Sequence, residues 1–320
     1  MSENISLFIP VMQFMGIFIF MATSALWLRY EGVISSEHAP IISRMITDLV
    51  LPALVFYKIS SANLDPRQME AMFAMIGAEL AIGVASWVIG KFLLRLDRPA
   101  LGAFILASTF GSTNLMGTAL VQIVFPGDSE ALASGILLSL GGVGIPVSSV
   151  GVIIALYFGS ADGKIDLLQV LKSFLLSPII IAFLFGLFWA YFALPVSGTI
   201  LTIIFGAMKF TGISLTFLVA LLTGLTVKPI TKRDLGWPMI CCALLVLIIE
   251  PILAYEIDLR IGDQSPSSAL LLLLGAMPSS PIAIALSLRY GCDVELSSKL
   301  VVGTCILCAI TLPSIAYFYA

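Results

Sequence analysis

The sequence has little charge and almost no histidine. Of its 320 residues only 11% are charged and one is histidine, whereas 59% are hydrophobic and the mean hydropathy is +1.09. A soluble domain is about 25% charged and about 45–50% apolar, because polar side chains must cover its surface. The composition therefore excludes a soluble enzyme and a disordered chain. A net charge of -3, without a dense basic cluster, also argues against a nucleic-acid partner.

Residue sets for catalysis and for metal binding are missing as well. His38 is the single histidine, and no zinc-type set can be assembled from it and the cysteines. No Ser-His-Asp triad can be proposed with His38 alone. The glycine-rich segment Gly141-Gly142-Val143-Gly144 lacks the lysine of a phosphate-binding loop. We therefore expect no enzymatic activity, no cofactor, no metal and no direct use of ATP.

The sequence contains instead ten long apolar stretches. Each is close to the 20 or so residues that a helix needs to cross a bilayer. They lie at residues 5–27, 39–60, 69–94, 99–125, 131–158, 167–193, 197–227, 234–255, 267–289 and 294–319. The sequence therefore predicts an all-α membrane protein with ten transmembrane helices, whose function lies within the bilayer.

Lysine and arginine gather on one side of the predicted membrane. Of the 16 such residues, twelve flank the connections that follow the odd-numbered helices: Arg29, Arg44, Lys91, Arg95, Arg98, Lys164, Lys172, Lys228, Lys232, Arg233, Arg289 and Lys299. Cytoplasmic loops carry such an excess. The residues before the first stretch have no positive charge, so we expect it to be a retained helix and not a signal peptide. The prediction is a multi-pass protein of the inner (plasma) membrane with both termini outside the cytoplasm.

The ten stretches divide into two halves of five. An odd number of helices in each half gives the halves opposite orientations, as in inverted-repeat transporters. We expect a first repeat at residues 1–158, a cytoplasmic linker at 159–166 and a second repeat at 167–320. The fourth and ninth helices are each interrupted, and the interruptions occupy corresponding places in the two halves. Such paired interruptions indicate the binding site of a transporter.

Both interruptions consist of residues that break or cap helices. One is Phe110-Gly111-Ser112-Thr113-Asn114-Leu115-Met116-Gly117, and the other is Met277-Pro278-Ser279-Ser280-Pro281. Proline removes a backbone donor, and hydroxyl or amide side chains cap new half-helices, whose N-termini attract anions. The predicted substrate-binding residues are Ser112, Thr113, Asn114, Gly117, Pro278, Ser279, Ser280 and Pro281. The alternative is a pair of ordinary kinks that neighbouring helices tolerate.

A few charged residues fall inside the predicted helices. Glu79, in the third helix, and Glu250, in the eighth, are predicted to carry a proton or to balance charge, because ionisable residues at membrane depth are usually functional. The alternatives are a structural pair with a buried cation for Glu79 and an external funnel for Glu250. Asp48 and Lys209 are expected to form structural salt bridges, within or between subunits.

Three segments resemble the auxin efflux carrier family. They are Asp48-Leu49-Val50-Leu51-Pro52-Ala53-Leu54-Val55-Phe56 with Ser60 after it, Ala276-Met277-Pro278-Ser279-Ser280-Pro281 with Arg289-Tyr290-Gly291 after it, and the stretch from Leu300 to Thr311-Leu312-Pro313. The resemblance covers nearly the whole chain. It implies ten helices in two inverted repeats, with helices 4 and 9 broken and crossing near the midplane, and a homodimer formed through helices 2 and 7. The fold is similar to that of sodium/proton antiporters and bile-acid sodium symporters.

The fourth helix departs from the pattern of this family, which resembles Asn-Thr-Gly-x-x-Gly-Ile-Pro. When the two are matched on Gly117, Ser112 stands in place of the asparagine and Ala119 in place of the proline. The break is therefore expected to depend on glycine and on capping. After Pro281, Ile282 and Ala283 stand where relatives often have an asparagine, which predicts a less polar site.

The resemblance implies a transport function, because bacterial members of the family are taken to be permeases for small organic acids and plant members export auxin. The leading prediction is a secondary transporter of a small organic anion, an auxin-like acid or a mono- or dicarboxylate, that works by alternating access. Its driving force is expected to be a proton gradient or the membrane potential. The alternatives are a sodium-coupled organic anion symporter and a non-transporting membrane sensor.

Overall fold

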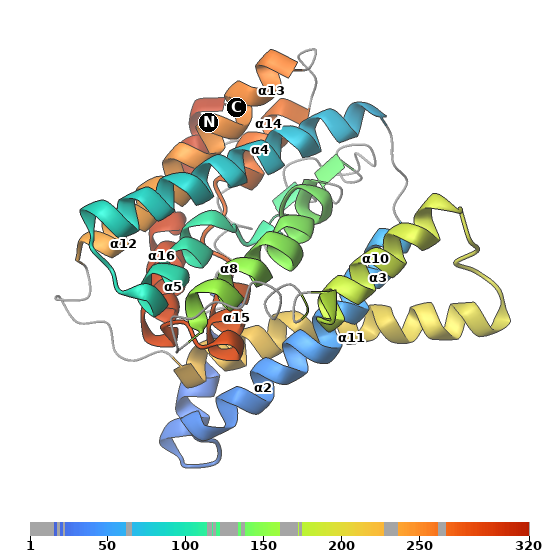
Figure 1. Ribbon diagram of the computed structural model, residues 1–320, viewed down its shortest axis with the longest axis horizontal. Helices are drawn as coiled ribbons and strands as arrows, with labels where there is room; N and C mark the ends of the chain where they lie inside the picture. The colour runs from blue at the N-terminus through green and yellow to red at the C-terminus, as the bar shows by residue number, and fades with distance from the viewer. Residues whose placement is uncertain are drawn as a thin grey trace.

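The computed structural model describes most of the apolar helices of the chain. The described residues are 16–17, 20–21, 23–61, 66–113, 117, 120–121, 134–135, 138–160, 172, 175–226, 236–261 and 267–319. Within these parts of the chain every named element is a helix (Figure 1). The all-α fold class is therefore confirmed.

Six helices in the described residues are long and apolar enough to cross a membrane. They are Ser36–Tyr57, Glu70–Leu93, Gly141–Gly159, Thr199–Leu225, Trp237–Arg260 and Val294–Ile315. In chain order they coincide with the second, third, fifth, seventh, eighth and tenth predicted helices. The chain is thus a multi-pass membrane protein.

The other four predicted helices have different outcomes. Most of the first, at 5–27, lies outside the described residues. The sixth corresponds to α10 (Pro178–Tyr191), a shorter apolar helix of 14 residues. The fourth and ninth are interrupted, as described below. A total of ten spans and an inverted repeat therefore stay predictions.

Several spans consist of α-helical and π-helical segments in line, where η marks a π-helical or 3-10 segment. One contains η1 (Ser36–His38), α2 (Ala39–Met45), η2 (Ile46–Val50) and α3 (Leu51–Ser60), and the next α4 (Pro66–Val88) and η3 (Ile89–Leu93). A third span contains η5 (Leu138–Gly144), η6 (Val147–Gly151) and α8 (Val152–Gly159). A fourth contains α12 (Trp237–Leu244), η7 (Leu245–Ile249) and α13 (Glu250–Ile261). The helices α11 (Thr199–Thr226) and α16 (Val294–Tyr319) are continuous. π-Helical turns are rare and occur frequently at functional sites.

Proline stands in the first turn of many of these helices. Pro40, Pro52, Pro99, Pro178 and Pro238 each occupy the first or second helical position. At Pro99, Pro178 and Pro238 a helix begins, so the backbone N–H that proline lacks would have no partner inside the helix, and the fixed φ of proline already suits a helix. These three prolines therefore start helices at no cost in hydrogen bonds, whereas Pro40 and Pro52 lie within the span Ser36–Tyr57.

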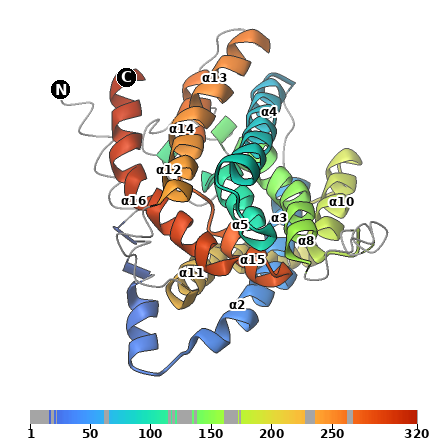
Figure 2. The ribbon, with the colours of Figure 1, turned by 60° about the vertical axis from the view of Figure 1, so that its left-hand side comes forward.

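The helices form two packed groups. In one group α3 packs against α10 and α11 through an aromatic cluster, in which the ring of Phe56 lies 5.5 Å from Phe185, 5.8 Å from Trp189 and 5.7 Å from Phe205. In the other group α4 packs against α5, α13 and η5. Figures 1 and 2 show α15 between these groups, where it contacts α2 and α11 on one side and α5, α8 and α16 on the other.

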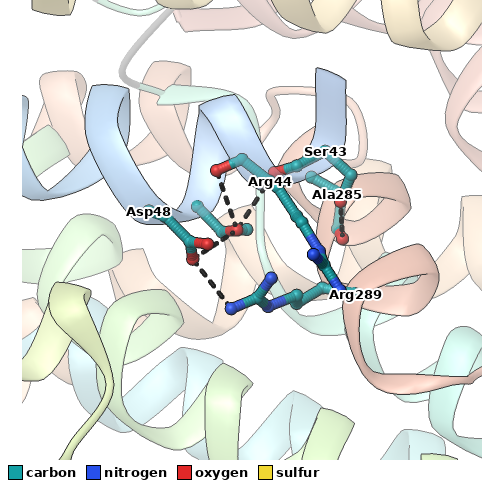
Figure 3. Close-up of polar contacts among 6 residues, drawn as sticks. Ser43, Arg44, Asp48, Ala285 and Arg289 are labelled. Atoms are coloured by element: carbon teal, nitrogen blue, oxygen red, sulfur yellow. Dashed lines mark hydrogen bonds and ion pairs between the residues drawn. The ribbon is translucent and has the colours of Figure 1, made fainter. Parts of the chain in front are cut away.

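Polar contacts join α15 to the group that contains α2 and η2 (Figure 3). Ser43 Oγ donates a hydrogen bond of 2.8 Å to the carbonyl of Ala285, and Arg289 Nη2 lies 3.0 Å from Asp48 Oδ1. Asp48 thus forms a salt bridge, but its partner is Arg289 and not Lys209. Lys209 takes part in no ion pair among the described residues.

The end of α15 is fixed by two glycines. Gly291 follows the helix with a φ of +88°, a left-handed conformation that glycine adopts most easily. Gly159, at the end of α8, lies directly against the backbone carbonyl of Tyr290, so that a Cβ there would overlap it. Only glycine at residue 159 allows α8 and α15 to approach this closely.

Candidate functional site

Both predicted interruptions are present in the structure. The helix α5 (Arg98–Thr109) ends where Phe110 takes an extended conformation, with φ -105° and ψ 113°. The helix α14 (Ser267–Gly275) is separated from α15 (Ile282–Tyr290) by the segment that contains both prolines. The local sequence explains both breaks, since glycine, serine and proline all disfavour a continuous helix.

The two interruptions lie side by side and are joined through their backbones. The Ser112 N–H donates to the Pro278 carbonyl at 2.7 Å, and the Ser280 N–H donates to the Phe110 carbonyl at 2.7 Å. Gly111 and Ser279 form an isolated antiparallel bridge between these two bonds. Two kinks in unrelated helices need no such pairing, so the breaks form a single structural unit.

Neighbouring helices hold this unit at Ser279. The Ser279 N–H donates to Thr304 Oγ1 of α16 at 3.2 Å, and Thr304 Oγ1 in turn donates to the Leu300 carbonyl at 2.8 Å. The thiol of Cys242 in α12 lies 3.6 Å from Ser279 Oγ. Thr304 and Cys242 are therefore part of the site, although the sequence analysis did not select them. No signal in the sequence distinguished them, since α16 contains several other hydroxyl residues and α12 a second cysteine.

Most of the predicted substrate-binding residues gather at the paired breaks. The hydroxyl residues among them, Ser112, Thr113, Ser279 and Ser280, are all buried. Ser280 Oγ accepts a hydrogen bond from the Ile282 N–H at 3.4 Å and so helps to cap α15. Pro278 and Pro281 lie within the second break.

The remaining predicted residues belong to the segment that follows α5. A Cβ on Gly117 would meet the side chain of Leu274 in α14, so glycine allows the close contact there. The Thr113 carbonyl accepts a hydrogen bond from Ser139 of η5 at 3.3 Å. The hydroxyl of Thr113 is buried and has no hydrogen-bond partner in the described part of the chain. Asn114 lies outside the described residues.

The two predicted coupling residues lie on helices that pack together. Glu79 of α4 and Glu250 of α13 are both 0% exposed. None of their four carboxyl oxygens has a hydrogen-bond partner among the described residues. The complete burial of Glu250 argues against an external funnel, and no cation of the described chain pairs with Glu79. The sequence analysis selected each residue separately and did not predict that their helices pack together.

Glu250 is also connected to the second break. Gly275, the last residue of α14, packs closely on Pro251, the residue that follows Glu250, so that a Cβ on Gly275 would lie 2.9 Å from Pro251 Cα. The second break therefore begins in direct contact with the backbone beside Glu250.

A cavity opens one helical turn away from Cys242 and Thr304. Its volume is about 350 Å³, and it is lined by Leu96, Ala100, Gly236, Pro238, Met239, Asp293, Glu295, Leu296, Lys299 and Leu300. Met239 and Leu300 lie one turn before Cys242 and Thr304, the two residues that contact Ser279. The cavity thus approaches the paired breaks along α12 and α16.

Comparison with known proteins agrees with this architecture. Residues 10–161 match the model of a family described as membrane transport protein, which is the auxin efflux carrier family. The resemblance to the auxin efflux carrier family is confirmed.

Two archaeal proteins are similar to the chain over most of its length. An uncharacterized transporter of Methanocaldococcus jannaschii is 23% identical over 269 residues, which cover 83% of this chain and 84% of that protein. An uncharacterized transporter of Methanothermobacter thermautotrophicus is 24% identical over 291 residues, which cover 89% of this chain and 91% of that protein. These two relatives, which are named as transporters, support transport as the general function.

Proposed function

We propose that the protein is a secondary transporter that moves a small organic anion across the membrane by alternating access. The observation that carries this proposal is the backbone pairing of residues 110–112 with residues 278–280 among buried hydroxyl groups. Breaks of this kind in membrane helices are used to bind substrates, because they expose backbone groups inside the protein. The family match and the transporter names of the relatives support the transport part of this proposal.

The substrate is proposed to bind through its carboxylate at the paired breaks. The N-terminus of α15, which begins at Ile282, provides the positive end of a helix dipole. The hydroxyl of Thr113 has no partner among the described residues and can donate to an anion. The proposed binding residues remain Ser112, Thr113, Asn114, Gly117, Pro278, Ser279, Ser280 and Pro281.

The cavity beside Met239 and Leu300 is proposed as the access route on one side of the membrane. It lies where α5, α12 and α16 begin, the side on which lysine and arginine are concentrated. The positive-inside rule makes this the cytoplasmic side. We accordingly propose an inner-membrane protein with both termini outside the cytoplasm.

The transporter is further proposed to be a homodimer. The resemblance implies contact through the seventh predicted helix, which is α11. Of the six candidate spans α11 is the least buried, at 29%. Its apolar side chains Phe210 and Ile213 are 75% and 62% exposed, which suits a subunit or lipid contact.

Flux into proteoliposomes tests the proposed function. Monocarboxylates, dicarboxylates and indole-type acids are presented with and without sodium and at several pH values. We expect uptake of one class of acid that follows the proton gradient or membrane potential and is lost in Ser279→Ala. Ser314→Ala serves as the matched control, because Ser314 lies on α16 and its hydroxyl bonds only to the Ile310 carbonyl.

The same experiment separates the alternatives. Uptake that requires sodium would identify the sodium-coupled symporter. No uptake of any acid by folded, correctly oriented protein would refute the organic anion transporter and favour the sensor.

A further inference from the structure

The burial of Glu79 and Glu250 is the least expected feature of the core. The two carboxyl groups lie on α4 and α13, helices that are far apart in the sequence but pack together, and both groups are completely buried. Their charges repel one another. Buried polar groups normally have hydrogen-bond partners, and buried charges are normally paired. Neither group has such a partner in the described part of the chain. The buried carboxyl oxygens of this pair therefore require a bound ligand.

Among the described side chains, the cations on the helices packed around this pair are engaged elsewhere or distant from it. Lys91, at the end of the α4 and η3 span, lies over the rings of Trp87 and Phe92, at 5.0 and 5.4 Å. Arg98, at the start of α5, donates to the Tyr157 carbonyl and the Ser160 hydroxyl.

The other ionisable groups on these helices are also distant or engaged. Lys299 of α16 pairs with Glu295 at 2.9 Å. Among the described side chains, the remaining charges on α4 and α13 lie more than one helical turn from the pair: Glu70, Glu256, Asp258 and Arg260. α14 and η5 contain no charged residue, and on α12 Cys242 is the titratable group that interacts with Glu250.

We propose that Glu79 and Glu250 form one proton-binding site, in which the two carboxyl groups share a single proton while the site is closed to water. Two ionised carboxylates cannot lie side by side in a dry interior without a cation, because desolvation and mutual repulsion both oppose it. A proton bonded to one group and accepted by the other satisfies an oxygen of each. A metal ion needs more ligands, and no group of three or more His, Cys, Asp or Glu suited to one occurs among the described residues.

The pair releases its proton when water reaches it. The O–H bond of the protonated carboxyl then breaks, the proton passes to water, and two hydrated carboxylates remain. Gly275 and Pro251 connect this site to the second break, so a rearrangement of the break and hydration of the pair occur together. This coupling rests on the proposed transport function, whereas the proton site itself can be tested without any substrate.

Infrared spectroscopy of the full chain in lipid nanodiscs tests the proton site. A protonated carboxyl group gives a C=O band that exposed, ionised carboxylates lack at neutral pH. We expect a band at neutral pH that corresponds to about one group per chain, since the proton belongs to the pair. The band should shift when glutamate is labelled with ¹³C at its side-chain carboxyl, which tests the assignment in the unaltered protein.

Three variants and one control assign the band to this pair. In E79Q and in E250Q the band should change in frequency or be lost, and in E79Q/E250Q it should disappear. In E256Q, which removes an exposed carboxylate from the same helix α13, it should be unchanged. A band that persists in the double variant, or a neutral-pH spectrum of the wild type without one, would overturn the proposal.

Sodium provides the remaining arm of the experiment. The spectra are recorded in sodium-free buffer and again after sodium is added. A band that is unaffected by sodium supports a proton site, and a band that sodium abolishes shows that a cation displaces the proton and overturns it. A protein that transports none of the acids could still show a glutamate band that is lost in E79Q/E250Q and is unaffected by sodium. That result would support the proton site while refuting the proposed function.

Discussion

Replacing Thr304 by valine tests how the second break is held. The Ser279 N–H is buried, and the Thr304 hydroxyl at 3.2 Å is its acceptor. Valine keeps the branched shape of threonine but leaves this N–H without that partner. A buried donor that loses its partner costs about 1–3 kcal/mol, so Thr304→Val should lower the free energy of unfolding by that amount. Because the break binds the substrate in our proposal, its affinity should fall as well.

Thr311→Val is the matched control on the same helix. The Thr311 hydroxyl is buried and has no hydrogen-bond partner among the described residues. Removing such a group is neutral or stabilising, since an unsatisfied polar atom disappears. The measurement is reversible unfolding of both variants in mixed micelles, followed by the flux assay. Equal stability of Thr304→Val and Thr311→Val would refute the proposed role of the Ser279 hydrogen bond.

Two further predictions concern the contacts around the broken helices. A double-mutant cycle with Asp48→Asn and Arg289→Gln should give a coupling energy of about 0.2–1 kcal/mol. This energy should decrease as salt is added, because the two side chains are partly exposed (38% and 26%). A coupling energy of zero at low salt would show that the ion pair does not persist. Gly275→Ala should lower the free energy of unfolding by about 1–3 kcal/mol, because the new Cβ would lie 2.9 Å from Pro251 Cα. Gly206→Ala meets nothing within 4 Å and should be neutral or stabilising, so equal unfolding midpoints for the two alanine variants would contradict the packing.

The breaks at residues 110–112 and 276–281 could be located from sequence because their causes are local. Proline removes a donor wherever it stands, and serine competes for backbone hydrogen bonds in any context. The same locality makes the apolar spans predictable, since the bilayer requires a certain length of apolar chain. The two breaks could also be related to each other from sequence, because they occupy corresponding positions in the two predicted halves of five helices.

The contacts of Glu79, Asp48 and Thr304 could not be predicted in the same way. Asp48 pairs with Arg289, which is more than 200 positions away, because α15 packs against η2. Thr304 contacts Ser279 because α16 runs past the second break. Such partners depend on how each helix is rotated about its axis and shifted along it relative to its neighbours. The spacing of apolar residues in the sequence does not determine either quantity.

The sequence by itself therefore determined that this chain is a helical membrane protein, and it located the two places where helices break. Both properties follow from the composition and chemistry of neighbouring residues. Only the tertiary structure decided that the breaks hydrogen-bond to each other and that Glu79 and Glu250 are buried on two helices that pack together. The physical reason is that these contacts arise when apolar helices pack together, and packing brings together polar groups whose separation along the chain carries no signal.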